Sequence, residues 1–451
     1  MIQNTKATIK NGIKFTNWSN KNNFYYHGFY HDFISKDDKI YPEISKYDIG
    51  NVDILNLIQY SQEDDTIEND FISMLSEKNN VPFLLTEEEN FLDPIFQFDQ
   101  FSQFSIHFDA RNFAKRLEEI GLSRGIRIED GIVKEINSEN GLTIDSILLD
   151  NGVEVKTDFI FDCTGFARLF IGKHFNSEWI SFSDSLPMKK AIPFFIDIDK
   201  ENIPGYTESI AMEYGWMWKI PLQHRYGCGY VYDSNFISDE DAKKEIETFL
   251  GFVPNYPKVD PFLFNPGCYK EVLIGNCLAV GLSSAFVEPL EATSIFQTIL
   301  LLKRFFNNKH HIFIKNKEYD KIFNKNYLKE TQDVVDFLYL HYMTNKKNNE
   351  FWKNFTKNNV MPETLKEKMF FLNKSFLTDE HAKSLFLSES FYVVARGLEL
   401  LNLKNLKDNI EINRISLFNK NFEERKLIYK DISHKLIKHS NFLKIMGGLK
   451  E

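Results

Sequence analysis

Two glutamates in the stretch GLSSAFVEPLEATSIFQTILLLKRFF, residues 281–306, have the type and spacing that could support chemistry. Glu288 and Glu291 stand in a short loop between an apolar run and an apolar helical pattern. A carboxylate is costly to hold beside a hydrophobic core unless something uses it. Either Glu291 satisfies the amides of the helix's first turn, or the loop forms part of a site.

The elements on either side of the loop would position these carboxylates. NCLAVGLSS is typical of a buried strand in a parallel or mixed sheet, closing on Gly281. A helix is expected after the loop, with Thr293 or Ser294 as its N-cap. Its apolar stripe would consist of Ile295, Ile299, Leu302 and Phe306. Free N–H groups at such a helix N-terminus favour an anion, and a halide, a flavin carbonyl or a phosphate would each fit.

The rest of the chain reads as mixed α/β structure. Residues 107–125 predict an amphipathic helix, and residues 31–104 predict surface loops with short helices. Three strand-like runs follow, separated by Asn-Gly turns, and predict an antiparallel meander. The third run ends in DCTGF, where Gly165 permits a sharp turn off the strand. From about residue 310 onward the pattern becomes helical.

Composition narrows the possible classes of function. The net charge of −10 argues against nucleic acid as a partner. The four cysteines are widely spaced and no His cluster has ligand spacing, so no metal site is predicted and a reducing compartment is favoured. The chain opens without a signal-peptide pattern and holds no apolar run of bilayer length, which predicts a cytoplasmic protein without a membrane partner.

Several motifs together resemble the flavin-dependent tryptophan halogenases. GLSSAFVEPLEATSI is similar to the family's flavin and halide loop. GWMWKIP, residues 215–221, fits the W-x-W-x-I-P signature that separates these halogenases from flavin hydroxylases. Further resemblances lie in IKFTNW, HFDA, DCTGF, LQHRYGCGYVYDSNFIS and HYMTNKKNNEFW. The resemblance covers essentially the whole chain.

This resemblance implies an FADH2-dependent halogenase that installs chlorine or bromine on tryptophan or a related indole. A separate flavin reductase would supply the reduced flavin, and O2 and a halide would give hypohalous acid. Lys10 and Glu291 match the family's catalytic residues, and Thr293 and Ser294 match its halide-binding pair.

The other family positions are carried over from the same motifs. Cofactor contacts are expected at Gly165, Gly281, Ser284 and Ile295. The indole would lie among His27, Phe29 and Phe386. The internal tunnel from the flavin would be lined by Trp216, Trp218, Ile220 and Pro221.

The implied architecture is an FAD-binding flavin monooxygenase-like fold with a C-terminal helical substrate module. We expect residues 1–309 to form the flavin-binding module and residues 310–451 the helical one. The G-x-G-x-x-G sequence that cradles the FAD pyrophosphate is not present, so the N-terminal βαβ unit is expected to be missing. Two alternatives stay open: a degenerate or split halogenase that needs a polypeptide carrying that unit, and a flavin hydroxylase of the same superfamily. A homodimer is compatible with each.

Overall fold

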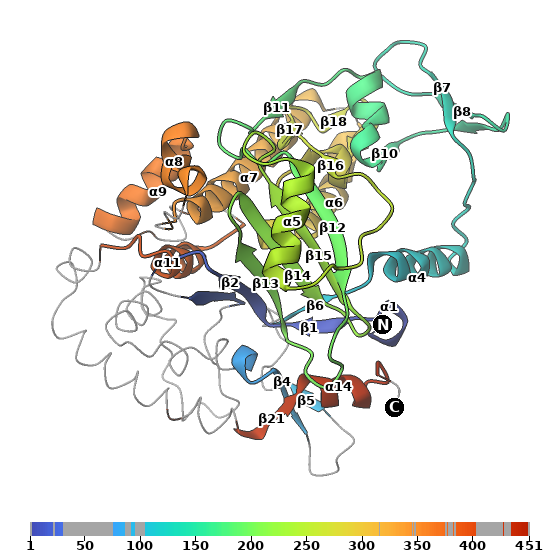
Figure 1. The fold of residues 1–451 in the computed structure, drawn as a ribbon. Helices are drawn as coiled ribbons and strands as arrows, with labels where there is room; N and C mark the ends of the chain where they lie inside the picture. Colours follow the sequence, from blue (N-terminus) through green and yellow to red (C-terminus); the bar gives the residue numbers. More distant parts are fainter. Residues whose placement is uncertain are drawn as a thin grey trace, which may run out of the picture.

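The computed structural model describes residues 2–20, 23–29, 75–85, 92–94, 104–314, 316–344, 346, 349–374, 377, 382, 385–402, 427 and 434–449. Its arrangement is shown in Figure 1. Most of residues 31–104 lies outside these ranges. The described part holds strands β4 (Asn80–Leu85) and β5 (Leu92–Pro94), where the sequence predicts only loops and short helices.

A seven-stranded sheet forms the centre, in the order β16-β12-β15-β14-β13-β2-β3. Its strands are β2 (Gly12–Thr16), β3 (Phe24–Gly28), β12 (Lys190–Ile196), β13 (Tyr206–Ala211), β14 (Gly215–Pro221), β15 (Tyr226–Tyr232) and β16 (Phe262–Leu263). Strand β2 runs parallel to β13 and antiparallel to β3. Just before it, β1 (Thr8–Lys10) pairs with β6 (Ser105–His107). Lys10 therefore stands where the chain enters the main sheet.

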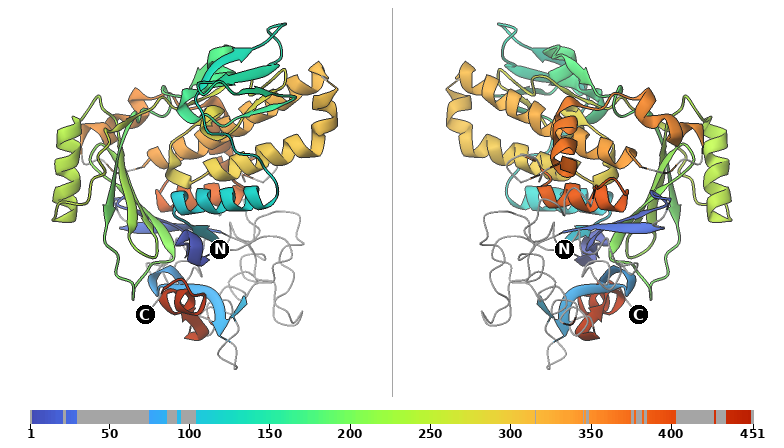
Figure 2. Two further views of the ribbon diagram at one scale, coloured as in Figure 1. Left: turned by 90° about the vertical axis from the view of Figure 1, so that its right-hand side faces the viewer. Right: turned by 90° about the vertical axis from the view of Figure 1, so that its left-hand side faces the viewer.

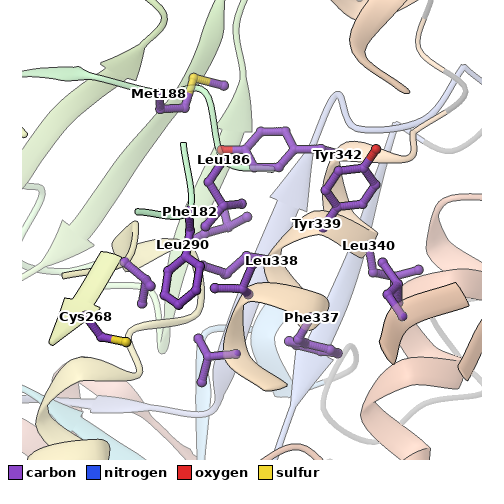
Figure 3. Packing of buried hydrophobic residues seen from close by; sticks show 14 of the residues in the cluster. Phe182, Leu186, Met188, Cys268, Leu290, Phe337, Leu338, Tyr339, Leu340 and Tyr342 are labelled. Atoms are coloured by element: carbon purple, nitrogen blue, oxygen red, sulfur yellow. The ribbon is translucent and has the colours of Figure 1, made fainter. Parts of the chain in front are cut away.

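Helices cover both faces of this sheet. The helices of the described ranges are α1 (Ile2–Thr5), α4 (Ala110–Ser123), α5 (Asp239–Leu250), α6 (Ser294–Phe313), α7 (Lys317–Tyr342), α8 (Glu350–Asn358), α9 (Glu363–Lys374), α11 (Ser388–Gly397) and α14 (His439–Ile445). Figure 2 shows α5 on one side of the sheet and α6 and α7 on the other. Met217 and Tyr230 pack toward α5. Trp216 and Val231, on the opposite face, join the largest buried cluster together with residues of α7. Figure 3 shows part of that cluster, including the side chains of Phe337, Leu338, Tyr339, Leu340 and Tyr342 of α7.

A smaller mixed sheet supports the loop of interest. Strand β10 (Ile160–Asp162) runs parallel to β19 (Cys277–Ala279), which pairs antiparallel with β18 (Leu273–Ile274). A third sheet joins β11 (Trp179–Ser181), β17 (Gly267–Tyr269) and β20 (Ala285–Phe286). The parallel strand expected before Gly281 is thus confirmed.

The expected meander is also confirmed, except that the end of its third run is a separate strand, β10, which belongs to the smaller mixed sheet. Strands β7 (Val133–Asn137), β8 (Ser146–Leu149) and β9 (Glu154–Lys156) pair antiparallel in that order. The glycines of the two Asn-Gly turns, Gly141 and Gly152, have φ angles of 67° and 85°. These positive φ angles are the reason that glycine stands there.

Two helices do not bury the faces that the sequence predicts. Helix α4 forms where expected and is capped by Asp109, but none of its residues, all of which are described, is buried. In α6, the predicted stripe is the solvent side, because Ile295, Ile299 and Phe306 are each more than half exposed. The buried residues of α6 are Gln297, Leu301, Phe305 and Ile312.

The two-module division remains a prediction. The expected boundary between residues 309 and 310 falls inside α6, and the C-terminal part includes strand β21 (Leu436–Lys438), which pairs with β4. No helix within the described ranges combines the length and the apolar character that crossing a bilayer requires.

Candidate active site

The Glu288–Glu291 loop is a rigid turn between β20 and α6. Pro289, Leu290 and Glu291 form a short 3₁₀ turn, and Ala292 ends it in the left-handed conformation with φ of 55°. Leu290 is buried in the core cluster, where Figure 3 shows it near Leu338 of α7 and Phe182. Both carboxylates are consequently held inward rather than toward solvent, and Glu288 is fully buried.

Glu291 is bracketed by two histidines from distant parts of the chain. His27 Nδ1, on β3, lies 3.0 Å from Oε1 and 2.9 Å from Oε2 of Glu291. His341 Nε2, near the end of α7, lies 2.8 Å from Oε1. Burial alone would raise the pKa of Glu291, but the charge and hydrogen bonds of His27, reinforced by those of His341, lower the pKa to about 2. Glu291 is therefore an ionised carboxylate inside the protein.

Lys10 is a buried cation whose pKa responds to the charge of this carboxylate. It ends β1, and only 7% of its surface is exposed. Burial lowers the pKa of Lys10 to about 8, partly opposed by the negative charge of Glu291. A buried lysine that can lose its proton near neutral pH differs from the ordinary solvated lysine of a strand. Lys14, on β2, instead has an ion-pair partner, with its Nζ 2.7 Å from Glu77 Oε1.

Strand β14 places the GWMWKIP residues beside the same loop. Trp216 is buried, and its Nε1 donates to Glu288 Oε2 at 3.1 Å. Trp218 is half-buried, and a Cβ on Gly229 of β15 would lie 2.1 Å from its ring, so glycine is needed opposite it. Pro221 ends the strand, and its carbonyl accepts from Thr8 Oγ1 at 2.7 Å. This contact brings the end of β14 next to the strand that carries Lys10.

The residues proposed to hold an indole come together only in part. The ring of His27 lies 5.5 Å from Phe337 and 6.2 Å from Phe386, and these two phenylalanines stack at 3.8 Å. Phe29 is half-buried just after β3, and its N–H donates to Asn11 O at 3.4 Å. His27 also contacts Glu291, as described above. Its role as a substrate contact, like those of Phe29 and Phe386, remains a prediction.

Two glycine turns fit the ring end of a flavin. Gly165 follows β10 and Gly281 follows β19, with φ of 63° and 64°, and a Cβ on Gly165 would meet open space. They lie beyond the carboxyl ends of neighbouring parallel strands, where α/β folds bind ligands. Asp162 fixes the first turn by accepting from the N–H groups of Thr164, Phe170 and Ile171.

The remaining loop positions use their polar atoms in different ways. Ser284 Oγ donates to Gly281 O and lies 2.7 Å from Tyr327 OH, so this hydroxyl is used within the protein. Thr293 is the N-cap of α6, with no side-chain capping bond, and Ser294 and Ile295 begin the helix. Cofactor contacts at Ser284 and Ile295, and halide contacts at Thr293 and Ser294, remain predictions.

His341 and Tyr342 are site residues that the sequence did not single out. They contact Glu291 and Glu288, respectively, from the last turn of α7. The motif HYMTNKKNNEFW begins with this pair. The sequence signal for these two residues was that they are adjacent polar residues at the end of a long helical pattern. Which carboxylate each of them contacts depends on tertiary packing.

Comparison with known proteins defines the class first. The fold resembles solved flavin-dependent halogenases, among them BrvH from Brevundimonas sp. BAL3, with a TM-score of 0.80 and 25% identity over 98% of this chain and 87% of that one. A tryptophan halogenase from Shewanella frigidimarina superposes with a TM-score of 0.84 at 22% identity, covering 99% of this chain and 84% of the other.

The family follows from the sequence comparison. The tryptophan halogenase family model matches residues 1–408, and the chain belongs to this family. It is 30% identical over 273 residues to tryptophan 6-halogenase SttH of Streptomyces toxytricini, covering 59% of this chain and 51% of that protein. It is 29% identical over 260 residues to tryptophan 7-halogenase RebH of Lentzea aerocolonigenes, covering 56% and 48%. The chain spans about half the length of these curated relatives.

Proposed function

We propose that this chain forms the halogenating part of an FADH2-dependent halogenase that acts on tryptophan or a related indole. One observation carries the proposal: the buried carboxylate of Glu291 lies between His27 and His341, and its charge acts on the buried Lys10. This pairing would be costly in a merely structural core. It is supported by Trp216 and Trp218, which stand on the strand next to the same loop.

Gly165 and Gly281 would hold the ring end of FAD, and the N–H groups of Thr293 and Ser294 would hold the halide. When bound, the reduced flavin supplies the electrons with which O2 and halide give hypohalous acid. The side chains of Trp216 and Trp218 would keep the indole away from the flavin, so that hypohalous acid formed at the flavin travels to the indole.

Lys10 and Glu291 would then carry out the transfer. The Lys10 ammonium hydrogen bonds to hypohalous acid and orients it toward the arene. As the carbon–halogen bond forms, the halogen–oxygen bond breaks, and the oxygen leaves as water with a proton from Lys10. Glu291 stabilises the cationic arene and accepts the proton that the ring carbon loses. A carboxylate with a pKa of about 2 suffices, because a protonated arene is a strong acid.

The test compares Lys10→Ala and Glu291→Gln with the matched variant Lys14→Ala in the flavin-loaded protein. Lys10→Ala is expected to abolish halogenation while oxygen consumption and hypohalous acid formation continue. Glu291→Gln should slow halogenation by roughly two orders of magnitude or more, the scale of losing one preorganised charge. Lys14→Ala should keep the parent rate. A Lys10 or Glu291 variant at the parent rate, or a product whose mass does not depend on halide as for a hydroxylase, contradicts the proposal.

We also propose that the flavin-loaded state requires a nucleotide-binding unit that covers α6 and β10. Among the described strands β10 lies at the edge of its sheet, and an edge strand offers unpaired N–H and C=O groups with which a further strand can pair. Beside it, Phe161 contacts Phe306 of the exposed α6 stripe at 6.3 Å. We define the α6–β10 surface as Phe161, Ile295, Ile299, Phe306 and Phe313, each at least 38% exposed. An apolar surface beside an open parallel edge fits a further strand–helix unit, the kind that carries G-x-G-x-x-G.

A further inference from the structure

Glu288 is the second buried carboxylate of the loop, and the proposed reaction leaves it without a task. Its side chain is fully buried. Oε2 accepts hydrogen bonds from Trp216 Nε1, at 3.1 Å, and from the Tyr342 hydroxyl. Oε1 is also buried and meets no hydrogen-bond partner among the described residues. A buried carboxyl group in which one oxygen accepts two hydrogen bonds and the other accepts none costs free energy, and a function for Glu288 would explain that cost.

Glu288 and Glu291 are held in the same way, each by one residue of a strand in the main sheet and one residue of α7. Glu291 contacts His27 on β3 and His341 on α7, whereas Glu288 contacts Trp216 on β14 and Tyr342 on α7. Consecutive residues of one helix therefore hold the two carboxylates. Between them lie only Pro289 and Leu290, in a single 3₁₀ turn. A shift of Glu288 would consequently be passed on to Glu291.

The Trp216 contact reaches the segment that separates flavin from substrate. Trp216 is flanked by Trp218, at 6.1 Å between ring centroids. Its indole N–H needs a buried acceptor, because an unmet donor in a core costs the full desolvation of that group. Glu288 supplies the acceptor and so fixes which way the ring faces. Tyr342, stacked on Phe355 at 4.7 Å, ties the same oxygen to the helical side of the core.

We propose that Glu288 is a positioning residue, which sets the Trp216 ring and the Glu291 carboxylate in register by accepting hydrogen bonds from Trp216 and Tyr342. This inference rests on the proposed halogenase function. Glu288 touches neither substrate nor flavin; it acts through Trp216 and through the turn that leads to Glu291. Its loss would let hypohalous acid escape without slowing the formation of that acid.

The first test needs no bound flavin. The chain has five tryptophans, so its ¹⁵N-labelled indole N–H groups give few resonances, and Trp216→Phe identifies the one of Trp216. Glu288→Leu, which removes the acceptor but keeps an apolar filling, should move that resonance and speed its exchange with water about tenfold or more, the scale of a buried donor losing its acceptor. Glu288→Gln, which retains an acceptor oxygen, should restore most of the protection.

A matched control separates this effect from the loss of any Glu–Tyr contact. Glu245 of α5 accepts from Tyr230 OH at 2.8 Å on the other face of the sheet. Glu245→Leu should leave the Trp216 resonance at its parent position. An unchanged Trp216 resonance in Glu288→Leu, or an equal change in Glu245→Leu, overturns the inference.

The second test measures coupling in the flavin-loaded protein, as halogenated indole formed per hypohalous acid trapped in solution. Glu288→Leu should lower this ratio about tenfold with the total oxidant unchanged, and Glu288→Gln should keep most of it. If the parent protein halogenates and the Glu288→Leu variant is fully coupled as well, only the positioning role is overturned. Parent protein that forms oxidant but no halogenated product overturns the proposed function, and this inference with it.

Discussion

At the scale of single residues, one short loop holds two carboxylates whose pKa values move in opposite directions. Burial raises the pKa of Glu288 to about 7, although Tyr342 and Trp216 donate to it and partly oppose the shift. The nearby Glu291 is also buried, but His27 and His341 outweigh that burial and bring its pKa to about 2. Both glutamates are buried, so the groups that contact each carboxyl, and not its burial, decide whether it is ionised. Neutral Tyr and Trp donors stabilise a buried carboxylate less than two imidazoles do.

These shifts predict opposite effects of pH on stability. A carboxyl of lowered pKa stabilises the fold above its unfolded value, so the Glu291 contribution is present above about pH 4.5 and is lost as the pH falls toward 2. The Glu288 pKa is raised, so the fold loses stability as the pH rises from about 4.5 to 7. Each effect is on the order of a few kcal/mol, because a change of one in pKa corresponds to about 1.4 kcal/mol.

Urea unfolding across the pH range checks both effects. Glu288→Gln should flatten the fall in unfolding free energy between about pH 5 and 7, and Glu291→Gln should flatten the loss below about pH 4. If Glu288→Gln keeps the slope of the parent protein, Glu288 is already ionised in the fold and the assigned pKa is wrong.

Sequence patterns found some residues of this site and missed others for a physical reason. Lys10 and Glu291 were found because motif spacing along the chain marks them. His341 was not, because its contact with Glu291 arises only when α7 packs beside the loop. Glu288 stood out as a costly residue, but the identity of its donors, Trp216 and Tyr342, depends on how two distant elements meet.

At the scale of elements, α6 shows why the helix was predictable and its buried face was not. Apolar residues occur on both sides: Ile299 and Phe306 on one, Leu301 and Phe305 on the other. Periodicity identifies a helix, yet it cannot select a face when both are apolar. Helix α4 differs, because none of its residues is buried and its apolar residues Leu117 and Leu122 are exposed.

Adjacent phenylalanines of α6 provide a matched test of this assignment. Phe305 is 2% exposed and Phe306 is 56% exposed. Phe305→Ser should destabilise the protein by about 3–5 kcal/mol, as expected for emptying a core position. Phe306→Ser should change the unfolding free energy by about 0.5 kcal/mol or less, and it should reduce self-association of the isolated chain by removing part of the α6–β10 surface. Equal destabilisation by the two substitutions, measured by thermal melts, would contradict the assignment.

At the scale of the whole molecule, the substrate half of the proposed site is built into one core, whereas the cofactor half lies beside apolar side chains that the described residues leave exposed. The largest buried cluster joins the N-terminal strand residue Phe15, Trp216 of the sheet and Tyr342 of α7. The flavin side contains the two glycine turns after β10 and β19, beside the exposed α6–β10 surface. Residues that position Glu291 are thus stabilised within this chain. The given sequence, however, contains no G-x-G-x-x-G motif that would bind the nucleotide end of FAD.

This asymmetry predicts how residues 1–451 bind FAD on their own. The turns at Gly165 and Gly281 can contact the ring end, but the pyrophosphate would lack the helix N-terminus that normally offsets its charge. We therefore expect a dissociation constant weaker than about 1 µM, equivalent to less than about 8 kcal/mol of binding. Titration with FAD, followed by flavin fluorescence and by light scattering, measures affinity and dispersity together.

Adding a polypeptide with a G-x-G-x-x-G strand–helix unit should tighten FAD binding and suppress self-association. Phe306→Ser should weaken that rescue because it alters the α6–β10 surface. Submicromolar FAD binding by a monodisperse chain alone would show that the nucleotide is held elsewhere on this protein.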